Sequence, residues 1–160
     1  MATDMFIKIG AIKGESKDSA HTGEIDVLAW SWGLHNSGSA HHGGGMGAGK
    51  SSCSDLSFTK WIDKSTTDLM LACANGKHFP DATLVVRKAG EKPLEYLTIK
   101  LTDVLITSVS TGGSGGEDRL TENVSLNFAK IKVEYKEQTK TGGSGTSPNM
   151  TYSFLENKEG

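Results

Sequence analysis

Short stretches of alternating polarity, separated by glycine-rich turns, dominate this sequence. It contains 20 glycines but only three prolines. Because successive side chains of a strand point to opposite faces, this pattern predicts many strands joined by turns. We therefore expect a mainly β fold, a small β-barrel of two sheets with one short α-helix. The expected strands are Met5–Ala11, Glu24–Leu34, Asp55–Lys60, Ala82–Lys88, Leu94–Leu101, Val104–Ser110, Thr121–Glu137 and Met150–Leu155.

The segment STTDLMLACANG departs from the strand pattern and predicts the helix. Ser65, followed three residues later by Asp68, is typical of a capping box, and Gly76 supplies a C-terminal stop. Because a helix this short is unstable alone, it must dock on the sheet, as a plug or lid over one end of the barrel. The docking face would contain Leu69, Ala72 and Cys73.

The size and charge of the chain limit what it can do. A length of 160 residues suits a single domain, residues 1–160, with one core. The formal net charge of −2 argues against a nucleic-acid binder, because such proteins need a concentrated positive field. The basic residues are spread along the chain, and we expect them on solvated surfaces: Lys8, Lys13, Lys60, Lys77, Arg87, Lys100 and Lys130.

The N-terminal segment shows no basic stretch followed by an apolar run, so we expect no Sec-type signal peptide. No stretch approaches the roughly 20 apolar residues that span a bilayer, so we expect no membrane insertion. The chain is therefore expected to fold in the cytoplasm and to leave the cell only by a route that needs no N-terminal signal. Cys53 and Cys73 would be reduced structural thiols in that compartment.

The strand expected at Glu24–Leu34 is apolar on both of its faces. Simple alternation places Trp30 and Trp32 on one face together with Leu28 and Leu34. The other face would carry Ile25, Val27, Ala29, Ser31 and Gly33. A strand that is apolar on both faces is buried on both, so we expect the second face to meet something beyond the first core.

The long strand expected at Thr121–Glu137 changes phase part-way along. Its apolar residues alternate first as Val124, Leu126 and Phe128, and then as Ile131, Val133 and Tyr135. A bulge near Ala129–Lys130 would reconcile the two halves and bend the strand, as happens at the corners of small barrels.

Residues 44–51, GGMGAGKS, match the P-loop pattern G-x-x-x-x-G-K-[ST]. A working P-loop lies between a buried strand and a helix that begins at the lysine, so that the helix N-terminus faces the phosphates. Here polar residues precede the loop, and the residues after Lys50 alternate as a strand. Because such matches arise easily by chance in glycine-rich sequence, we expect no nucleotide binding.

No other motif indicates catalysis or a cofactor. The five histidines lack the regular spacing with acidic or cysteine partners that metal sites favour. No nucleophile signature such as G-x-S-x-G is present. We therefore expect no catalytic residues, no metal and no cofactor, in a protein that is not an enzyme.

Three segments resemble the haemolysin-coregulated protein family, Hcp. They are GESKDSAHTGEIDVLAWSWG at 14–33, DLSFTKWIDKSTTDLMLACANGKHF at 55–79, and the run from VVRKAGEKPLEY to FAKIKVEY at 85–135. The resemblance extends from near Ile7 to Tyr135 and is weaker in the tail. We expect His35–Lys50 to be the most variable stretch.

The resemblance implies a β-barrel with one helix, whose protomers close into a hexameric ring. Such rings would stack into the inner tube of a bacterial type VI secretion system, in contact with its sheath and spike proteins, and would be secreted. They would carry small effector proteins in the lumen. A ring of head-to-tail contacts requires two different, complementary surfaces on each subunit.

Two groups of residues are candidate contact sites in such a ring. Ala29 and Ser31 point away from the tryptophan face, so we expect them to line the lumen and meet cargo. The alternative is that they pack against the helix inside the same barrel. The second group would form an exposed loop that contacts a neighbouring subunit or ring: Gly38, His41, His42, Gly44, Gly45, Met46, Gly47, Gly49 and Lys50.

Two other classes of function stay open at this point. A small-ligand-binding β-barrel would hold a molecule inside the monomer, and a P-loop protein would bind a nucleotide through Gly44–Ser51. Members of the family with a C-terminal toxin domain would be enzymes. The tail after Tyr135 is too short to hold an active site, so that variant is disfavoured.

Overall fold

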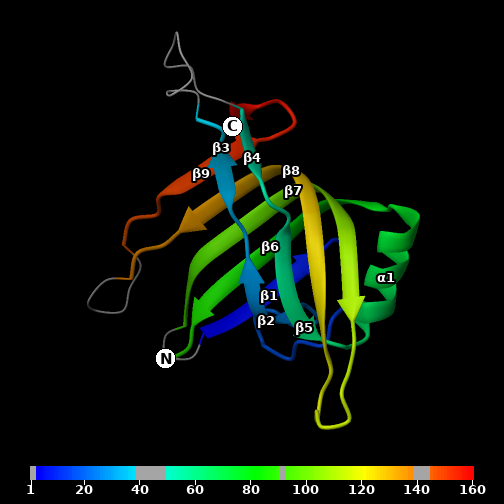
Figure 1. Cartoon of the computed structure of the whole chain (residues 1–160). Coiled ribbons are helices and arrows are strands. Elements are labelled where there is room, and N and C mark those ends of the chain that lie inside the picture. The colour runs from blue at the N-terminus through cyan, green and yellow to red at the C-terminus, as the bar shows by residue number, and fades with distance from the viewer. Residues whose placement is uncertain (1–2, 39–49, 91–92, 139–144) are drawn as a thin grey trace.

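A computed structural model describes residues 3–38, 50–90, 93–138 and 145–160 (Figure 1). The predicted mainly β fold with a short helix is confirmed. The elements are β1 (Thr3–Ile9), β2 (Ile25–Ser31), β3 (Leu34–Asn36), β4 (Ser51–Cys53), β5 (Leu56–Trp61), α1 (Ser65–Asn75), β6 (His78–Lys88), β7 (Leu94–Thr111), β8 (Thr121–Tyr135), β9 (Asn149–Ser153) and β10 (Lys158–Glu159).

Six antiparallel strands close into a barrel in the order β8, β5, β2, β1, β6, β7, because β7 pairs again with β8. The predicted barrel is thus confirmed. β9 and β10 extend the sheet from β8, while β3 and β4 form a separate ribbon that projects beyond one end of the barrel (Figure 1). The strands expected at Leu94–Leu101 and Val104–Ser110 are one continuous strand, β7.

The helix α1 has the predicted position, but its N-terminus is stabilised differently. The backbone N–H of Ser65 donates to Asp63 Oδ1 at 2.8 Å, and the Ser65 hydroxyl donates to the same oxygen. The residue before the helix, Lys64, makes no side-chain cap hydrogen bond, and Ser65 bonds to Asp63, so the predicted capping box of Ser65 with Asp68 is wrong. Gly76 ends the helix as predicted, in the left-handed region with φ 69°. The predicted docking face is buried or half-buried, at Leu69, Ala72 and Cys73.

A bulge in β2 corrects the expectation of a strand that is apolar on both faces. The register of β2 on β5 shifts between Val27 and Ala29. The extra residue shifts the alternation of side chains by one position. Ile25 and Val27 before the bulge are therefore buried, and Trp30 after the bulge packs on the same core. β2 therefore has one apolar face, and its other face is exposed on the single chain, so the expectation that this face meets something beyond the core stays a prediction. The exposed residues of the strand are Asp26, Leu28, Ala29 and Ser31.

In three neighbouring strands, β6, β7 and β8, the alternation of buried and exposed side chains shifts by one residue at the same level of the sheet. We call this line across the strands the corner. Buried side chains there are three residues apart instead of two: Phe79 and Ala82 in β6, Leu101 and Val104 in β7, Phe128 and Ile131 in β8. The register of β7 on β8 is the same on both sides of the corner, and Asp103 within it has φ 55°. The phase change predicted at Ala129–Lys130 is therefore present, but it is shared by three strands and is not a bulge in one.

A buried ion cluster lies inside the barrel beside the start of α1. Lys60 on β5 is fully buried and pairs with Glu122, directly opposite on β8. Lys60 Nζ also lies 3.1 Å from Asp63 Oδ1, and Thr66 Oγ1 donates to Glu122 Oε2 at 2.6 Å. The expectation that Lys60 is solvated is wrong. Two carboxylates compensate the desolvation of one ammonium group, which is the condition for burying such a charge.

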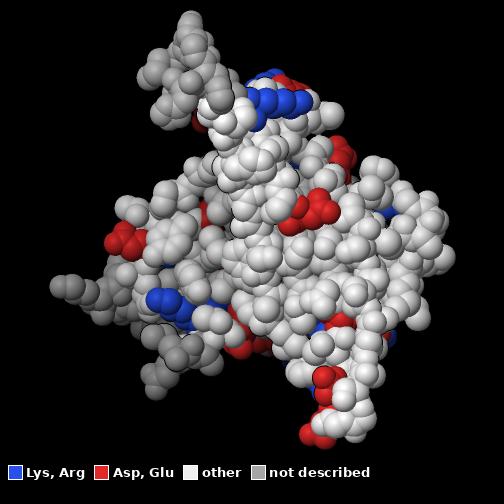
Figure 2. Space-filling model, in the orientation of Figure 1, with Lys and Arg blue, Asp and Glu red and all other residues white. Residues whose placement is uncertain are grey.

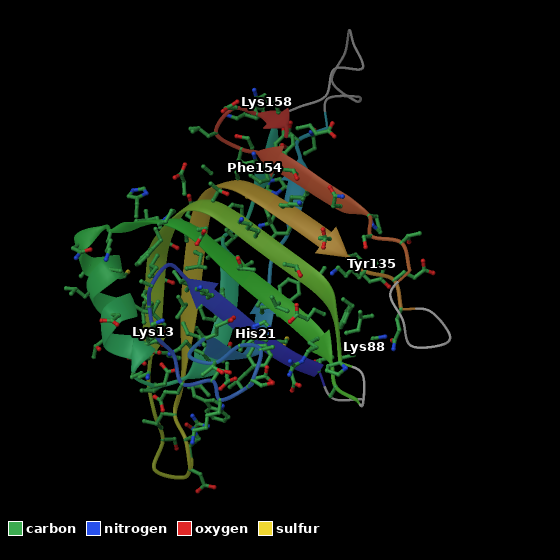
Figure 3. All side chains as sticks on the ribbon, turned by 180° about the vertical axis from the view of Figure 1, so that it is seen from behind. Lys13, His21, Lys88, Tyr135, Phe154 and Lys158 are labelled. Carbon is green, nitrogen blue, oxygen red and sulfur yellow. The ribbon has the colours of Figure 1, made fainter. Side chains whose placement is uncertain are left out.

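His21 fixes the connection between β1 and β2 against the outer surface of the barrel (Figure 3). Its ring stacks on Phe6 with centroids 4.4 Å apart. Its nitrogens lie 3.0 Å from Glu24 Oε2 and 2.6 Å from Glu95 Oε1. Burial lowers the pKa of His21, but the hydrogen bonds and charges of the two carboxylates outweigh burial, so the pKa is raised.

A second ion pair fixes the same connection nearby. The Arg87 guanidinium donates to both carboxylate oxygens of Asp18, at 3.0 and 2.6 Å, and to Asp4 at 3.2 Å. The hydrogen bonds from Arg87 lower the pKa of Asp18 to about 2. His21 and Arg87 are therefore neutralised within the chain itself.

Candidate functional site: an uncharged face of the barrel

Small, uncharged side chains align across four adjacent strands on one outer side of the barrel. In one row Ser31 pairs with Ser57, Ser57 with Ser125, and Ser125 with Ser108. The next row contains Ala29, Thr59, Asn123 and Ser110, paired in the same order. Residues paired across antiparallel strands point to the same side of the sheet, so the two rows form one surface. We call these eight residues the hydroxyl face.

Hydrogen bonds within the hydroxyl face join its two central strands, β5 and β8. The hydroxyls of Ser57 and Ser125 lie 3.1 Å apart, and Thr59 Oγ1 donates to Asn123 Oδ1 at 2.6 Å. A hydroxyl both donates and accepts, so these polar groups satisfy one another without a charge. The surface is therefore polar, yet it presents no fixed ion to a partner.

Alternation and two bulges together assemble this face. Beneath it, the intervening residues of β5 and β8 are buried in the core: Leu56, Phe58, Val124 and Leu126. At the two ends of the serine row, register shifts before Ala29 in β2 and before Ser108 in β7 bring Ser31 and Ser108 into line with Ser57 and Ser125. Without these inserted residues, β2 and β7 would turn the alternate set of side chains to this side of the sheet, and Ser31 and Ser108 would point away from it.

Charged groups border the hydroxyl face but do not enter it. Asp55 lies at one edge, where it accepts hydrogen bonds from Thr107 Oγ1 at 2.6 Å and from Asn127 Nδ2 at 3.1 Å. Figure 2 shows a mostly white face with an acidic group above its middle, and further charged atoms of both signs at the margins and acidic atoms at the lower tip. The absence of charge is thus a property of one continuous patch.

The structure places both predicted lumen residues on this face. Ala29 and Ser31 are exposed, so the alternative that they pack against the helix inside the barrel is wrong. Sequence reasoning missed the other six members, although their alternation with apolar residues is visible in the sequence. They are Ser57, Thr59, Ser108, Ser110, Asn123 and Ser125.

Only the two ends of the predicted contact loop lie among the described residues. Gly38 is exposed with φ 62°, and its N–H donates to Asn36 Oδ1 at 3.1 Å. Lys50 is exposed and is followed at once by β4, not by the helix that a P-loop requires. Nucleotide binding through Gly44–Ser51 therefore lacks its structural context. The other predicted residues lie outside the described ranges: His41, His42, Gly44, Gly45, Met46, Gly47 and Gly49.

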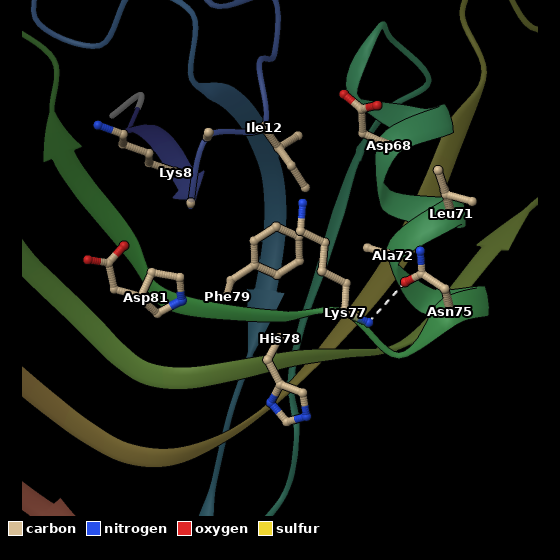
Figure 4. A pocket seen from close by; sticks show the side chains of 13 residues that line it. Lys8, Ile12, Asp68, Leu71, Ala72, Asn75, Lys77, His78, Phe79 and Asp81 are labelled. Atoms are coloured by element: carbon tan, nitrogen blue, oxygen red, sulfur yellow. Dashed lines mark hydrogen bonds between the residues drawn. The ribbon is translucent and has the colours of Figure 1, made fainter.

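A groove lies between α1 and the start of β6, on the outside of the barrel (Figure 4). Leu71 and Phe79 supply apolar surface, and Lys77 Nζ lies 5.3 Å from the centre of the Phe79 ring. Charged residues of both signs border it: Lys8, Asp68 and Asp81.

The barrel interior itself is filled by packed core side chains, which disfavours a small molecule held inside the monomer.

Within residues 3–38, 50–90, 93–138 and 145–160, no three His, Cys, Asp or Glu side chains are placed to hold a metal ion. In the same ranges, no helix has the length and apolar character needed to cross a bilayer. Cys53 and Cys73 are free thiols, and burial raises the pKa of Cys53. The hydroxyl face, a continuous surface of paired residues across four strands, is the arrangement that best indicates a function.

Residues 6–135 match the protein family described as Type VI secretion system effector, Hcp. The chain belongs to the Hcp family. It is 64% identical over 149 residues to Protein hcp1 of Pseudomonas aeruginosa, a match that covers 92% of each protein. The crystal structure of Hcp1 from Salmonella typhimurium is 42% identical, with a TM-score of 0.82 and 99% of each chain covered. A solved type six secretion system protein is 30% identical, with a TM-score of 0.93, covering 99% of this chain and 100% of that one.

The resemblance to Hcp seen in three sequence segments is therefore confirmed. Hcp proteins are tube proteins of type VI secretion, a structural and secreted family. For an Hcp subunit, the question that the structure raises is which surface meets which partner.

Proposed function

We propose that this Hcp chain, acting as one domain over residues 1–160, assembles into hexameric rings whose channel is lined by the hydroxyl face. The rings stack into the inner tube, which contacts sheath and spike proteins of the secretion system. The observation that supports this most directly is the continuous uncharged surface of eight small residues across β2, β5, β8 and β7.

Six-fold repetition explains why such a surface suits a channel. Every side chain on the channel wall recurs once per subunit, so a single lysine or aspartate would place six like charges around one pore. Their repulsion would be felt by the ring and by any cargo, because the charges lie close together in a confined space. Small hydroxyl groups avoid this repulsion and keep the channel wide.

The same face suits the transport of small effector proteins in the lumen. Serine and threonine hydroxyls donate or accept as a partner requires, so they accommodate different protein surfaces. Ser31 and Ala29 contribute an exposed part of this wall. We assign cargo contact to Ser31 in particular.

The ribbon of β3 and β4 supports a contact with a neighbouring subunit or ring through Gly38–Lys50. A two-stranded ribbon is marginally stable by itself in water. β3 is exposed along its whole length, and Leu34 within it is 50% exposed. A neighbour that covers the ribbon would bury this apolar side chain.

We also propose where the chain folds and which ligands and activities it lacks. The chain folds in the cytoplasm and is secreted with the tube, and it does not insert into a membrane. It acts with no cofactor, no nucleic acid and no catalytic step.

Native mass spectrometry of the purified chain, without nucleotide or metal, tests the ring directly. We expect a six-subunit species, and a stable monomer at micromolar concentration would overturn the proposal. Ser31→Gln then tests the lumen: rings should persist while co-purification of an effector is lost. The matched control is Ser19→Gln, an exposed serine on the connection between β1 and β2, which should retain cargo. Loss of the folded ring in Ser31→Gln would contradict the lumen assignment.

A further inference from the structure

A row of lysines crosses the side of the barrel opposite the hydroxyl face. Lys8 pairs with Thr83, Thr83 with Lys100, and Lys100 with Lys132. All three lysines are exposed. The three lysines lie on β1, β7 and β8, and Thr83 lies on β6 between them; these strands form the sheet seen from behind in Figure 3. We call Lys8, Lys100 and Lys132 the lysine row.

The lysine row is not neutralised within the described part of the subunit. None of its three side chains takes part in an ion pair there. Asp81 and Glu134 occupy the adjacent rows on either side, and they form no ion pair in these ranges either. The charges of the row are therefore directed to the solvent.

This arrangement carries a cost in folding stability. Lys100 and Lys132 are direct cross-strand neighbours, whose Cβ atoms lie about 4.5–5.5 Å apart in such pairs, and like charges in that position are destabilising. On the same side of the barrel, His21 and Arg87 each bind two carboxylates. The chain thus pairs His21 and Arg87 with carboxylates but leaves this row unpaired, which indicates a partner outside the subunit.

We propose that the lysine row binds an acidic protein surface whose carboxylates lie opposite the three ammonium groups. The proposal rests on the proposed function in one respect, because the ring turns the hydroxyl face inward and so leaves the lysine row on the outer wall. Repetition around a ring and along a stack multiplies weak single contacts into avid binding. A partner with a matching repeat would therefore bind strongly, although each subunit offers only three charges.

The neighbouring acidic residues favour a protein partner over nucleic acid. The row on one side contains Asp81 together with Lys130, and the row on the other side contains Glu134, so a continuous polyanion such as a DNA duplex would meet negative charges at Asp81 and Glu134 beside the lysines. A protein surface can place discrete carboxylates opposite the lysines and cations opposite Asp81 and Glu134. Charge complementarity of this kind sets specificity and the rate of association.

The test measures binding of labelled poly-L-glutamate, and of a DNA duplex of similar charge, to the assembled protein at low salt. The row variant carries Lys8→Gln, Lys100→Gln and Lys132→Gln. The control variant loses three other exposed lysines, Lys13, Lys17 and Lys64, each changed to Gln, so that the net charge is the same. We expect the affinity for poly-L-glutamate to fall about tenfold in the row variant and less than about twofold in the control.

Three outcomes would overturn the proposal. The first is an equal loss of affinity for poly-L-glutamate in both variants, and the second is no loss of affinity in the row variant. The third is row-dependent binding of the DNA that is tighter than that of poly-L-glutamate, which would assign the row to nucleic acid. Native mass spectrometry of the same samples separates this result from the proposed function. If the unmodified chain forms no ring, the proposed function fails, while row-dependent binding is still measured on the monomer.

Discussion

Lys100 and Ser108 lie on the same strand, β7, yet they belong to opposite sides of the barrel. In the hydroxyl face, to which Ser108 belongs, polar side chains bond to one another, and the charged Asp55 lies only at its edge. Near Lys100, like charges face each other across the strands. Neither pattern resembles the ion-paired surface around His21 and Arg87, which neutralises its own charges. Folding alone favours the mixed surface, so the two unmixed surfaces suit the contacts that we propose with molecules outside the chain.

The largest expected effect comes from the interior that holds the two sides in place. Glu122→Ala removes the main partner of Lys60 and leaves a buried ammonium group with one carboxylate, which should cost about 3–5 kcal/mol of unfolding free energy. Urea denaturation measures the loss. Glu134→Ala, on the surface of the same strand, is the control and should change stability by less than about 0.5 kcal/mol. Equal effects would show that the ion cluster does not hold the barrel together.

A charge placed on the hydroxyl face should abolish its function without unfolding the subunit. Ser108→Lys changes an exposed residue, so the unfolding free energy should move by less than about 0.5 kcal/mol. Retention of a lumenal effector should fall at least about tenfold, equivalent to roughly 1.4 kcal/mol. Co-purification of effector with ring measures this effect. Unchanged retention would remove the functional distinction between the two sides.

The ion-paired surface should respond to pH, whereas the hydroxyl face should not. Because the folded pKa of His21 is raised above its usual value of 6.5, its ion pairs stabilise the fold fully below about pH 6.5. This stabilisation is lost as the pH rises through the folded pKa of His21. We expect a decrease of about 0.5–1 kcal/mol across that interval, measured by urea denaturation at several pH values. The slope should disappear in His21→Gln, and a slope that persists there would assign the effect to another group.

The smallest expected effect is a gain in stability on the lysine side. Lys100→Thr removes repulsion with Lys132 and introduces a good strand former, so we expect the unfolding free energy to rise by about 0.2–1 kcal/mol. Thermal unfolding at low salt measures the gain, which should shrink at high salt as screening weakens the repulsion. A loss of stability would mean that Lys100 has a stabilising role within the subunit.

Local patterns predicted the elements well but not their pairing. The helix bounds and the stop at Gly76 follow from short-range chemistry, as do most strands and the phase change at Ala129–Lys130. The hydroxyl face could not be predicted as a surface, because Ser57 meets Ser125 across 68 positions of the chain and register is a long-range property. Ser31 and Ala29 were found only because their own strand has an evident apolar side.

Two errors have the same physical origin. Strict alternation assigned Val27 and Trp30 to opposite faces, but the bulge between them places both on the core. Composition assigned Lys60 to solvent, but Glu122 and Asp63 supply buried partners from other parts of the chain. In both cases a tertiary contact overrides a rule that considers only neighbours in the sequence.

The corner shared by β6, β7 and β8 limits how this protein can evolve and be engineered. On one side of the corner β7 and β8 contribute to the lysine row, and on the other side they contribute to the hydroxyl face. Inserting or deleting one residue in either strand would therefore turn the buried side chains of half the strand outward and the exposed ones inward. Changes of length should therefore be tolerated in the hairpin 112–120, which is exposed throughout and projects from the barrel (Figure 1). A peptide tag inserted there would not change which side chains β7 and β8 direct to the hydroxyl face and to the lysine row. This hairpin is therefore a suitable attachment point for labels.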